Sequence, residues 1–279
     1  MHLHLESNLE SFLTKTRAYL ERDPHVNSMI RSLAFRTLAA GKSMPLLAVL
    51  VDSKGEVHAA GLQADRDRSF LISKISLDLA KNFAQALANR IEALPGVYGP
   101  KSTVEAFFAE WAANRGATPG RIKNLRLFAL DELLPPKTPS GFARFARPAD
   151  RDLLFSWLRA FHDEAVPDDP SPTREELYKN VDLGIAKQEF FIWEDEDKPV
   201  SLVGSRRETA IERWIAPVYT PHALRGRGYG SALTAVASQR ILESGKKALL
   251  FTDLANPISN SIYQKIGYRP LEDFRQYSF

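Results

Sequence analysis

The segment RGRGYGS, residues 225–231, constrains this chain more than any other, because it puts three glycines and two arginines between two structured runs. The apolar run RWIAPVYTP before it predicts a core strand, and ALTAVASQRILESG after it predicts a helix. A helix N-terminus has backbone N–H groups without intrahelical partners and a partial positive charge of about half an elementary unit. Glycines just before it let a ligand approach the main chain and permit positive φ. The junction therefore predicts a site for a phosphate or a diphosphate.

Two common phosphate loops do not fit this spacing. A Rossmann loop needs a third glycine where Ser231 stands, and the Gly-Lys-Ser/Thr ending of a P-loop is absent. The competing structural interpretation is a tight strand-to-helix turn. In a phosphate site, Arg225 and Arg227 would pair with phosphate oxygens. In a tight turn, they would be solvated loop residues. The segment alone leaves both open.

The chain as a whole predicts an α+β fold in two domains. Its 279 residues suffice for two domains of roughly 100 to 200 residues each. The proline-rich segment 131–150 predicts an inter-domain linker, which gives domains at 1–136 and 137–279. In the second domain, helices are expected over 149–165, 174–186, 229–244 and 259–268, around a central, mostly antiparallel sheet with a hairpin turn at 194–199.

The first half repeats this order loosely, as in a degenerate duplication. Strands are expected within the hairpin 45–64 and at 69–74, 96–100 and 124–133, and helices over 77–94 and 102–116. Between strand and helix, FLISKISLDLAK contains no glycine. The anion site is therefore predicted only in the second half.

Composition excludes several classes of function. The chain has no cysteine, so disulfides, thiolate metal sites and a cysteine nucleophile are excluded, and a reducing cytoplasm fits. The apolar run PLLAVLV is too short to cross a bilayer, and the first residues lack a signal-peptide core. A net charge of +3 on dispersed basic residues gives no nucleic-acid surface. Apart from His2-x-His4, at a terminus expected to be mobile, histidine spacing predicts no metal site.

Two blocks of the second half have the spacing of one known family. The first is formed by Arg225, Gly228 and Gly230, which fit Gln/Arg-x-x-Gly-x-Gly/Ala at the start of a helix. The second is NPISNSIYQKIGY, with Asn256, Tyr263, Gly267 and Tyr268 in the matching positions. On these two motifs, residues 142–279 resemble the GNAT superfamily of N-acetyltransferases. The first half resembles the motif-less GNAT-like companion domain of some members.

The resemblance implies a GNAT fold with an acetyl-CoA site and no metal. The diphosphate would lie on the backbone amides of Gly226, Arg227, Gly228, Tyr229, Gly230 and Ser231. The pantetheine arm would add to the preceding strand along Val218, Tyr219 and Thr220, where that strand and the next splay apart after a bulge. Asn256, before Pro257, would cap a helix, contact the coenzyme, or do both.

The implied reaction is direct attack of a primary amine on the acetyl group in a ternary complex. Tyr263 would protonate the leaving thiolate, unless it is only a core aromatic with a surface hydroxyl. The backbone N–H of Val218 would stabilise the thioester oxygen, an effect of about 3 kcal/mol for one such donor. Glu212 is a candidate base, because even spacing places it on the strand face of Val218 if no bulge intervenes. His162 and Glu164 are alternatives.

Three other functions compete with the acetyltransferase. They are a non-catalytic acyl-CoA-binding regulator, a Fem-type aminoacyl transferase that also pairs two GNAT-like halves, and a nucleic-acid module using RGR as a clamp. The intact RGRGYG favours coenzyme A, and the lack of interleaved aromatic residues disfavours nucleic acid. The amine acceptor is not identified, because the loop VPDDPSPT at 166–173 has no decisive chemistry. The first domain would cover the cleft or shape the acceptor pocket.

Overall fold

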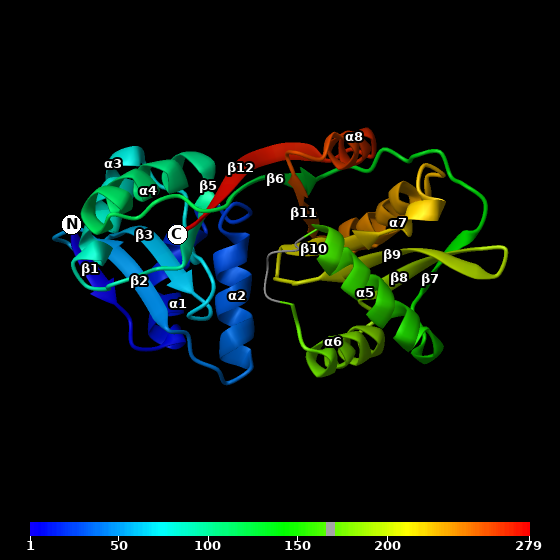
Figure 1. The fold of residues 1–279 in the computed structure, drawn as a ribbon, viewed down its shortest axis with the longest axis horizontal. Coiled ribbons are helices and arrows are strands. Elements are labelled where there is room, and N and C mark those ends of the chain that lie inside the picture. Colours follow the sequence, from blue (N-terminus) through cyan, green and yellow to red (C-terminus); the bar gives the residue numbers. More distant parts are fainter. Residues whose placement is uncertain (166–170) are drawn as a thin grey trace. The chain divides into compact units, whose positions relative to one another are not determined.

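A computed structural model describes residues 1–165 and 171–279, which form two compact units (Figure 1). Unit 1 comprises Met1–Leu127, Phe251–Asn256 and Pro270–Phe279. Unit 2 comprises Phe128–Leu250 and Pro257–Arg269. The segment 131–150, expected to be a linker, lies within unit 2 and contains a strand and a 3₁₀ helix. The domain boundary between residues 136 and 137 stays a prediction.

The elements alternate along the whole described chain. The strands are β1 (His2–Leu5), β2 (Leu46–Val51), β3 (Val57–Gln63), β4 (Phe70–Ile72), β5 (Gly96–Pro100), β6 (Ile122–Leu130), β7 (Phe142–Phe145), β8 (Phe190–Asp195), β9 (Lys198–Arg206), β10 (Glu212–Tyr219), β11 (Lys247–Asp253) and β12 (Arg269–Ser278). The helices are α1 (Leu9–Leu20), α2 (Ser28–Ala39), α3 (Leu77–Ala88), α4 (Lys101–Arg115), α5 (Arg151–Ala165), α6 (Arg174–Ala186), α7 (Tyr229–Glu243) and α8 (Pro257–Lys265). The 3₁₀ helices are η1 (Pro148–Asp150) and η2 (His222–Leu224).

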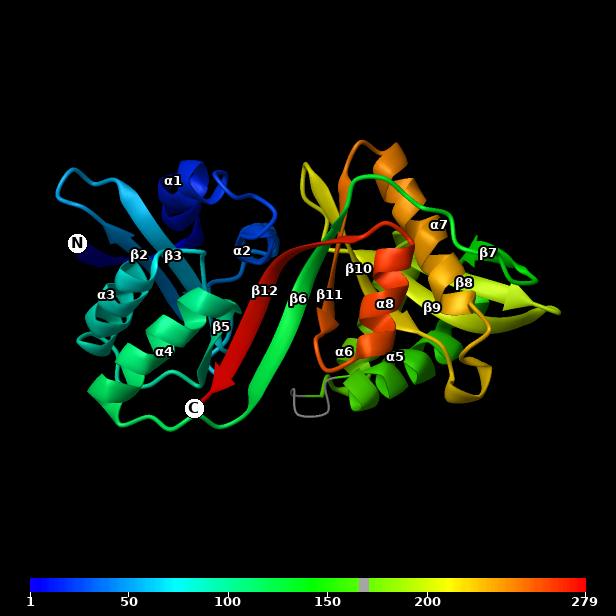
Figure 2. The ribbon, with the colours of Figure 1, turned by 90° about the horizontal axis from the view of Figure 1, so that it is seen from above.

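Unit 2 is a sheet with helices on both faces. Its strands follow the order β11-β10-β9-β8-β7, with β10 and β11 parallel and the other neighbours antiparallel. One core joins the sheet to α7 and α8, and a second joins the opposite face to α5 and α6 (Figures 1 and 2). The mostly antiparallel sheet is confirmed.

Local sequence explains most elements of unit 2. Helix α6 begins and ends as predicted, because Thr173 accepts from the Glu176 N–H and the Glu176 carboxylate accepts in return from the Thr173 N–H. The predicted turn at 194–199 is confirmed: Glu196 and Asp197 have φ of +48° and +56°, the left-handed values that a tight hairpin requires.

Unit 1 has the same layered arrangement. Its strands follow the order β1-β2-β3-β4-β5-β12, with β4 and β5 parallel. Helices α3 and α4 cover the core of one face, and α1 contacts β2 and β3 (Figure 1). Helix α3 ends six residues before the predicted helix, at the C-cap Asn89.

The first 40 residues contain elements that the sequence analysis missed. The mobile terminus expected around His2 and His4 is wrong, because β1 pairs with β2 from His2–Val51 to Leu5–Ala48. Helix α1 has Asn8 as N-cap, whose side chain accepts from the Ser11 N–H at 2.8 Å. The sequence did not predict strand β1, because its four residues are mostly exposed and show little alternation of polar and apolar side chains.

None of the helices in the described part of the chain has the length and hydropathy that a membrane crossing requires.

Candidate active site

The glycine junction joins β10 to α7 by way of η2 and has left-handed backbone at two positions. Gly226 has φ of +80°, and Gly228, the N-cap of α7, has φ of +86°. A β-carbon on either would meet nothing within 4 Å. Backbone conformation, rather than crowding, is therefore what requires glycine at these two positions.

The amides of this junction are available to a ligand. The first helical hydrogen bond of α7 runs from the Ala232 N–H to the Gly228 carbonyl at 3.0 Å. In the described part of the chain, the backbone N–H groups of residues 226–231 donate to no acceptor. Gly226, Arg227 and Gly228 are also exposed. The junction thus offers a run of open main-chain donors at the positive end of a helix, which suits an anion.

The third glycine of the motif, Gly230, is required for a different reason, which is close packing. A β-carbon on Gly230 would lie 3.2 Å from Thr220 Oγ1 and 3.8 Å from Val218 Cγ1, so the first turn of α7 crosses close to the end of β10. Ser201 fixes that strand end: its hydroxyl lies 2.8 Å from Thr220 Oγ1 and donates to the Tyr219 carbonyl at 3.1 Å. Sequence reasoning missed Ser201, although a serine inside the apolar run PVSLVG was a signal.

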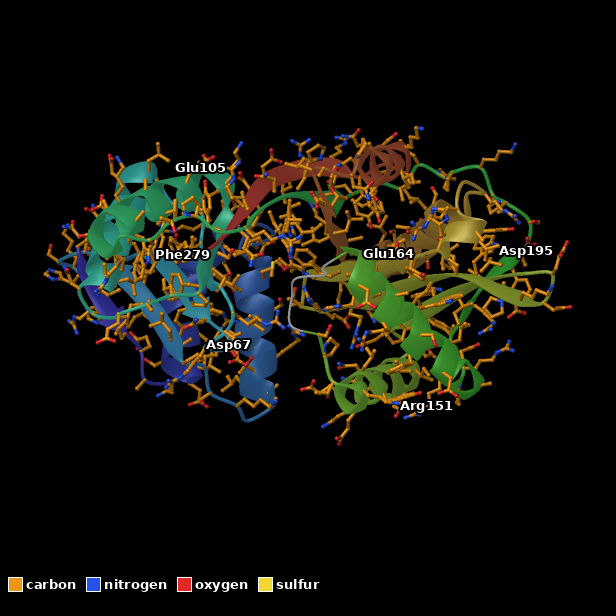
Figure 3. All side chains as sticks on the ribbon, in the orientation of Figure 1. Asp67, Glu105, Arg151, Glu164, Asp195 and Phe279 are labelled. Carbon is orange, nitrogen blue, oxygen red and sulfur yellow. The ribbon has the colours of Figure 1, made fainter. Side chains whose placement is uncertain are left out.

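Tyr229 and Ser231 differ in what their side chains can reach. Tyr229 is buried, packs in the core beneath α7 and donates its hydroxyl to Asp195 at the β8–β9 hairpin, which Figure 3 labels. Its expected part in the site is through its backbone N–H alone. Ser231 is half-buried within the first turn of α7.

The bulge expected from the resemblance is present in β10, whereas the splay stays a prediction. The register with β9 shifts between Ile215 and Val218, at a point where Pro217 has no N–H to give to the ladder. The parallel register with β11 runs from Glu212–Lys247 to Trp214–Leu249, and no pair is recorded beyond it in the described residues. The segment from Val218 to Thr220, expected to receive the pantetheine arm, follows the bulge.

Tyr263 lies in the same core cluster as Val218. Its ring meets that of Tyr268 edge to face, with centroids 5.9 Å apart. Burial raises the pKa of Tyr263 to about 12, so the hydroxyl is protonated at neutral pH. In the described part of the chain this hydroxyl has no hydrogen bond of its own, whereas that of Tyr268 lies 2.7 Å from Ser238 Oγ. Tyr263 is therefore a proton donor without an acceptor.

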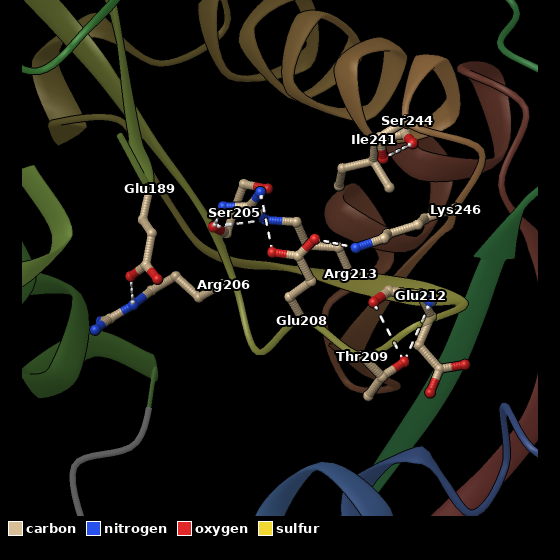
Figure 4. A network of polar contacts seen from close by, with 10 residues as sticks. All are labelled: Glu189, Ser205, Arg206, Glu208, Thr209, Glu212, Arg213, Ile241, Ser244 and Lys246. Atoms are coloured by element: carbon tan, nitrogen blue, oxygen red, sulfur yellow. Dashed lines mark hydrogen bonds and ion pairs between the residues drawn. The ribbon is translucent and has the colours of Figure 1, made fainter. Parts of the chain in front are cut away.

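The condition under which Glu212 would share a strand face with Val218 is not met, because β10 has a bulge between Ile215 and Val218. Ile215 and Val218 are three residues apart yet pack in the same core, because the bulge inserts one residue between them. Glu212 precedes Ile215 by three residues of regular strand, so its side chain points to the opposite face from Val218. It is fully buried, and its main chain exchanges hydrogen bonds with Thr209 (Figure 4). Its role as the base stays a prediction.

The other candidate bases lie near the end of α5. Glu164, labelled in Figure 3, forms an ion pair with Arg225. His162 is 13% exposed, and its Nδ1 lies 3.4 Å from Ser171 Oγ. Of the loop 166–173, whose chemistry the sequence left open, residues 166–170 lie outside the described residues.

The two loop arginines differ in their surroundings. Arg225 donates from Nε to the Thr220 carbonyl at 2.9 Å and from an Nη to Glu164. Arg227 is exposed and makes no hydrogen bond or ion pair within the described residues. Asn256 is exposed too and directly precedes α8, where its N–H donates to the Asp253 carbonyl at 3.0 Å.

The corresponding junction of unit 1, between β4 and α3, is closed by its own chain. The Ile75 N–H donates to Thr103 Oγ1 at 3.2 Å, and the Leu79 N–H donates to Ser76 Oγ, the N-cap, at 3.4 Å. This junction has no glycine, and two of its amides are already used.

One group of metal-type ligands in the described residues was not predicted. Asp52, Glu56 and His58 place one ligand atom each within 4.8 Å of one another, on the β2–β3 hairpin of unit 1. Asp52 already accepts the N–H groups of Lys54 and Glu56, and Glu56 pairs with Arg22 at 2.9 Å. These contacts account for the cluster without an ion.

Comparison with known proteins agrees with this geometry. Residues 151–268 match the model of the acetyltransferase (GNAT) family. An acetyltransferase of the GNAT family from Colwellia psychrerythraea is similar over 100% of both chains, at 11% identity and a TM-score of 0.63. A GCN5-related N-acetyltransferase from Sphaerobacter thermophilus is similar over 88% of this chain and 84% of its own, at 19% identity and 0.62. A Drosophila protein is similar over 99% of this chain and 98% of its own, at 14% identity and a TM-score of 0.68.

No curated protein matches the chain in sequence. Identities of 11 to 19% show a shared fold rather than a shared substrate. The α+β fold with a GNAT-like region before the second half is confirmed, because the similar structures cover the whole chain. This chain carries an acetyltransferase domain of the GNAT family over residues 151–268.

Proposed function

We propose that the protein is an N-acetyltransferase that moves the acetyl group of acetyl-CoA to a primary amine. The observation that supports this most strongly is the run of open backbone N–H groups at residues 226–231, within a domain of the GNAT family. Left-handed Gly226 and Gly228 leave the main chain exposed there, as the approach of a diphosphate requires. The lack of cysteine in the sequence supports a reducing, cytoplasmic setting.

The coenzyme would bind along two adjoining segments. Its diphosphate would accept hydrogen bonds from the amides of residues 226–231, and its pantetheine arm would lie along Val218–Thr220, beyond the last register pair of β10 with β11. Asn256 stays a proposed contact for the coenzyme. Ser201 holds the strand end that this arrangement uses.

The transfer needs one proton removed and one supplied. The amine loses a proton, and its nitrogen forms a bond to the acetyl carbonyl carbon as the carbonyl oxygen gains negative charge. The Val218 N–H is proposed to donate to that oxygen. The C–S bond then breaks, and the thiolate takes a proton from the Tyr263 hydroxyl, which burial keeps protonated at neutral pH. The products are the acetamide and free coenzyme A thiol, with the tyrosine reprotonated from solvent.

The proton acceptor for the amine is proposed among Glu212, His162 and Glu164, or a water chain. Glu164 is already engaged in an ion pair with Arg225. A buried carboxylate such as Glu212 serves only if a water or the amine reaches it.

The test has a binding arm and a turnover arm. In calorimetry, Gly228→Asp should abolish binding of coenzyme A, because it adds strain and negative charge beside the diphosphate, whereas Gly245→Asp should bind normally. Gly245, with φ of +75° just past the end of α7, is matched in strain but distant along the helix. Unchanged affinity in Gly228→Asp would overturn the proposal.

For turnover, a panel of polyamines, amino acids, aminosugars and peptide amines is assayed for free thiol released from acetyl-CoA. Amine-dependent release is expected for at least one class. Tight binding without release by any amine would instead favour a non-catalytic acyl-CoA-binding regulator.

A further inference from the structure

We infer that Arg227, rather than the motif arginine Arg225, is the side chain that pairs with the diphosphate, and that Arg225 positions the end of β10. This inference rests on the proposed function. It departs from a simple reading of the sequence, in which both arginines are equal candidates for phosphate contacts.

Arg225 is already committed within its own unit. Its Nε donates to the Thr220 carbonyl at 2.9 Å, and an Nη donates to Glu164 at the end of α5. The pKa of Tyr219 is raised, chiefly by burial and also by the charge of Glu164, and Arg225 opposes this rise. Tyr219 therefore lies close to the ion pair of Arg225 with Glu164. Arg225 thus links Thr220, the last residue of the proposed pantetheine segment, to helix α5.

The role of this contact follows from where Thr220 stands. Thr220 closes the segment that begins with Val218, whose N–H is proposed to stabilise the thioester oxygen. A donor of this kind works only when it is held at the position that the oxygen occupies in the transition state. Ser201 bonds the strand end from β9, and Arg225 bonds it from the loop.

Arg227 has none of these commitments. It stands between the two left-handed glycines, is exposed, and makes no ion pair or hydrogen bond in the described residues. The open amides of the junction begin one residue before it and continue beyond it. A guanidinium in this position can pair with phosphate oxygens through all of its nitrogens, whereas two of the three guanidinium nitrogens of Arg225 already donate to Thr220 and Glu164.

The test compares Arg227→Gln with Arg225→Gln, two matched changes separated by one glycine. Calorimetry of the full chain uses coenzyme A and dephospho-coenzyme A as probes. Arg227→Gln should weaken both by about 5- to 30-fold, the effect of one charge-assisted hydrogen bond at an exposed site. Arg225→Gln should keep both affinities within about twofold of the unmodified chain.

In turnover assays with an amine that the enzyme accepts, kcat should fall in Arg225→Gln and stay unchanged in Arg227→Gln. Arg225→Gln lowers kcat by about tenfold, because the Val218 donor is less well held, and Glu164→Gln lowers it in the same direction. Glu175→Gln, which removes an exposed carboxylate in the first turn of α6, is the control and leaves kcat unchanged. Arg227→Gln raises the KM for acetyl-CoA and keeps kcat.

Three outcomes decide the matter. If Arg225→Gln weakens coenzyme A as much as Arg227→Gln does, the inference is wrong. If Arg227→Gln weakens coenzyme A but not dephospho-coenzyme A, Arg227 serves the 3′-phosphate and its assignment to the diphosphate is overturned. If the unmodified chain binds neither probe, the proposed function itself fails, a result distinct from either of the others.

Discussion

Gly230 and Thr220 lie so close that a β-carbon on the glycine would come within 3.2 Å of the threonine Oγ1. Thr220 has little freedom to move aside, because its hydroxyl lies 2.8 Å from Ser201 Oγ and its carbonyl accepts from Arg225. The small last residue of the glycine motif therefore has a packing role in this chain: it seats the first turn of α7 against the end of β10.

Gly230→Val should misplace that turn. Overpacking of a close contact costs about 1–3 kcal/mol of unfolding free energy, and the shifted amides should weaken coenzyme A by at least about tenfold. Urea denaturation and calorimetry measure the two effects. Gly245→Val is the control at the other end of α7, where φ is +75° and nothing lies within 4 Å. It should lose a similar amount of stability through backbone strain but retain coenzyme affinity. Equal affinity losses in the two variants would contradict the packing role.

Tyr263→Phe should separate catalysis from binding. The change removes the proposed proton donor and keeps the ring that packs on Tyr268. We expect kcat to fall by about 100-fold, a usual size for a lost general acid, with coenzyme A affinity unchanged. Tyr268→Phe is the control, since it also removes a buried hydroxyl, the one that lies 2.7 Å from Ser238. It should reduce stability and leave kcat nearly unaltered. A kcat for Tyr263→Phe equal to that of the unmodified enzyme would make Tyr263 a core aromatic only.

The same tyrosine should make stability sensitive to alkaline pH. Burial raises the pKa of Tyr263 to about 12, above the value near 10 of an unfolded tyrosine. Between these values the folded state holds a proton that the unfolded state releases, so stability falls as pH rises. Below pH 10 the contribution is fully present. The unfolding free energy of Tyr263→Phe, relative to the unmodified chain, should therefore improve from pH 9 to pH 11.5 in denaturant titrations. A constant difference across that range would show that the hydroxyl is not buried from solvent.

The sequence predicted the glycine junction because its features are local. Left-handed Gly226 and Gly228 and the helix that starts at Tyr229 follow from residue type and short spacing. The bulge before Val218 was expected only from the family resemblance. The capping box of α6 is equally local. These are the elements in which propensity, capping and pattern agree.

What the sequence could not predict depends on contacts between distant residues. The sequence left the face of Glu212 open, because that face depends on whether a residue is inserted between Glu212 and Val218. The partner of Arg225 is Glu164, 61 residues away, and no spacing rule connects them. Strand β12 begins with three exposed residues, 269–271, so its start has no alternation of buried and exposed positions that could reveal it.

The network around Arg144 should be the most sensitive ionic site of unit 2. Arg144 donates to both oxygens of Asp150, at 2.7 and 3.0 Å, and to Glu194, and all three side chains are at most 15% exposed. Removing one member leaves buried charge without its partner, which costs about 3 kcal/mol or more. Arg144→Met should therefore destabilise the protein strongly in urea denaturation. Arg151→Met, which breaks the exposed pair with Asp182, should have a far smaller effect.

The loss of unfolding free energy in Arg144→Met should also depend on pH. Burial tends to raise the pKa of Asp150, but the hydrogen bonds from Arg144 and from the Arg147 N–H outweigh it, so the net pKa is lowered. An acid with a lowered pKa contributes stability above its ordinary value of about 4 and loses it as pH falls through the folded pKa. The difference in unfolding free energy between Arg144→Met and the unmodified chain should be constant from pH 5 to 7 and shrink below about pH 4. A difference that persists undiminished at pH 3 would mean that Arg144 acts through its packing rather than through its charge.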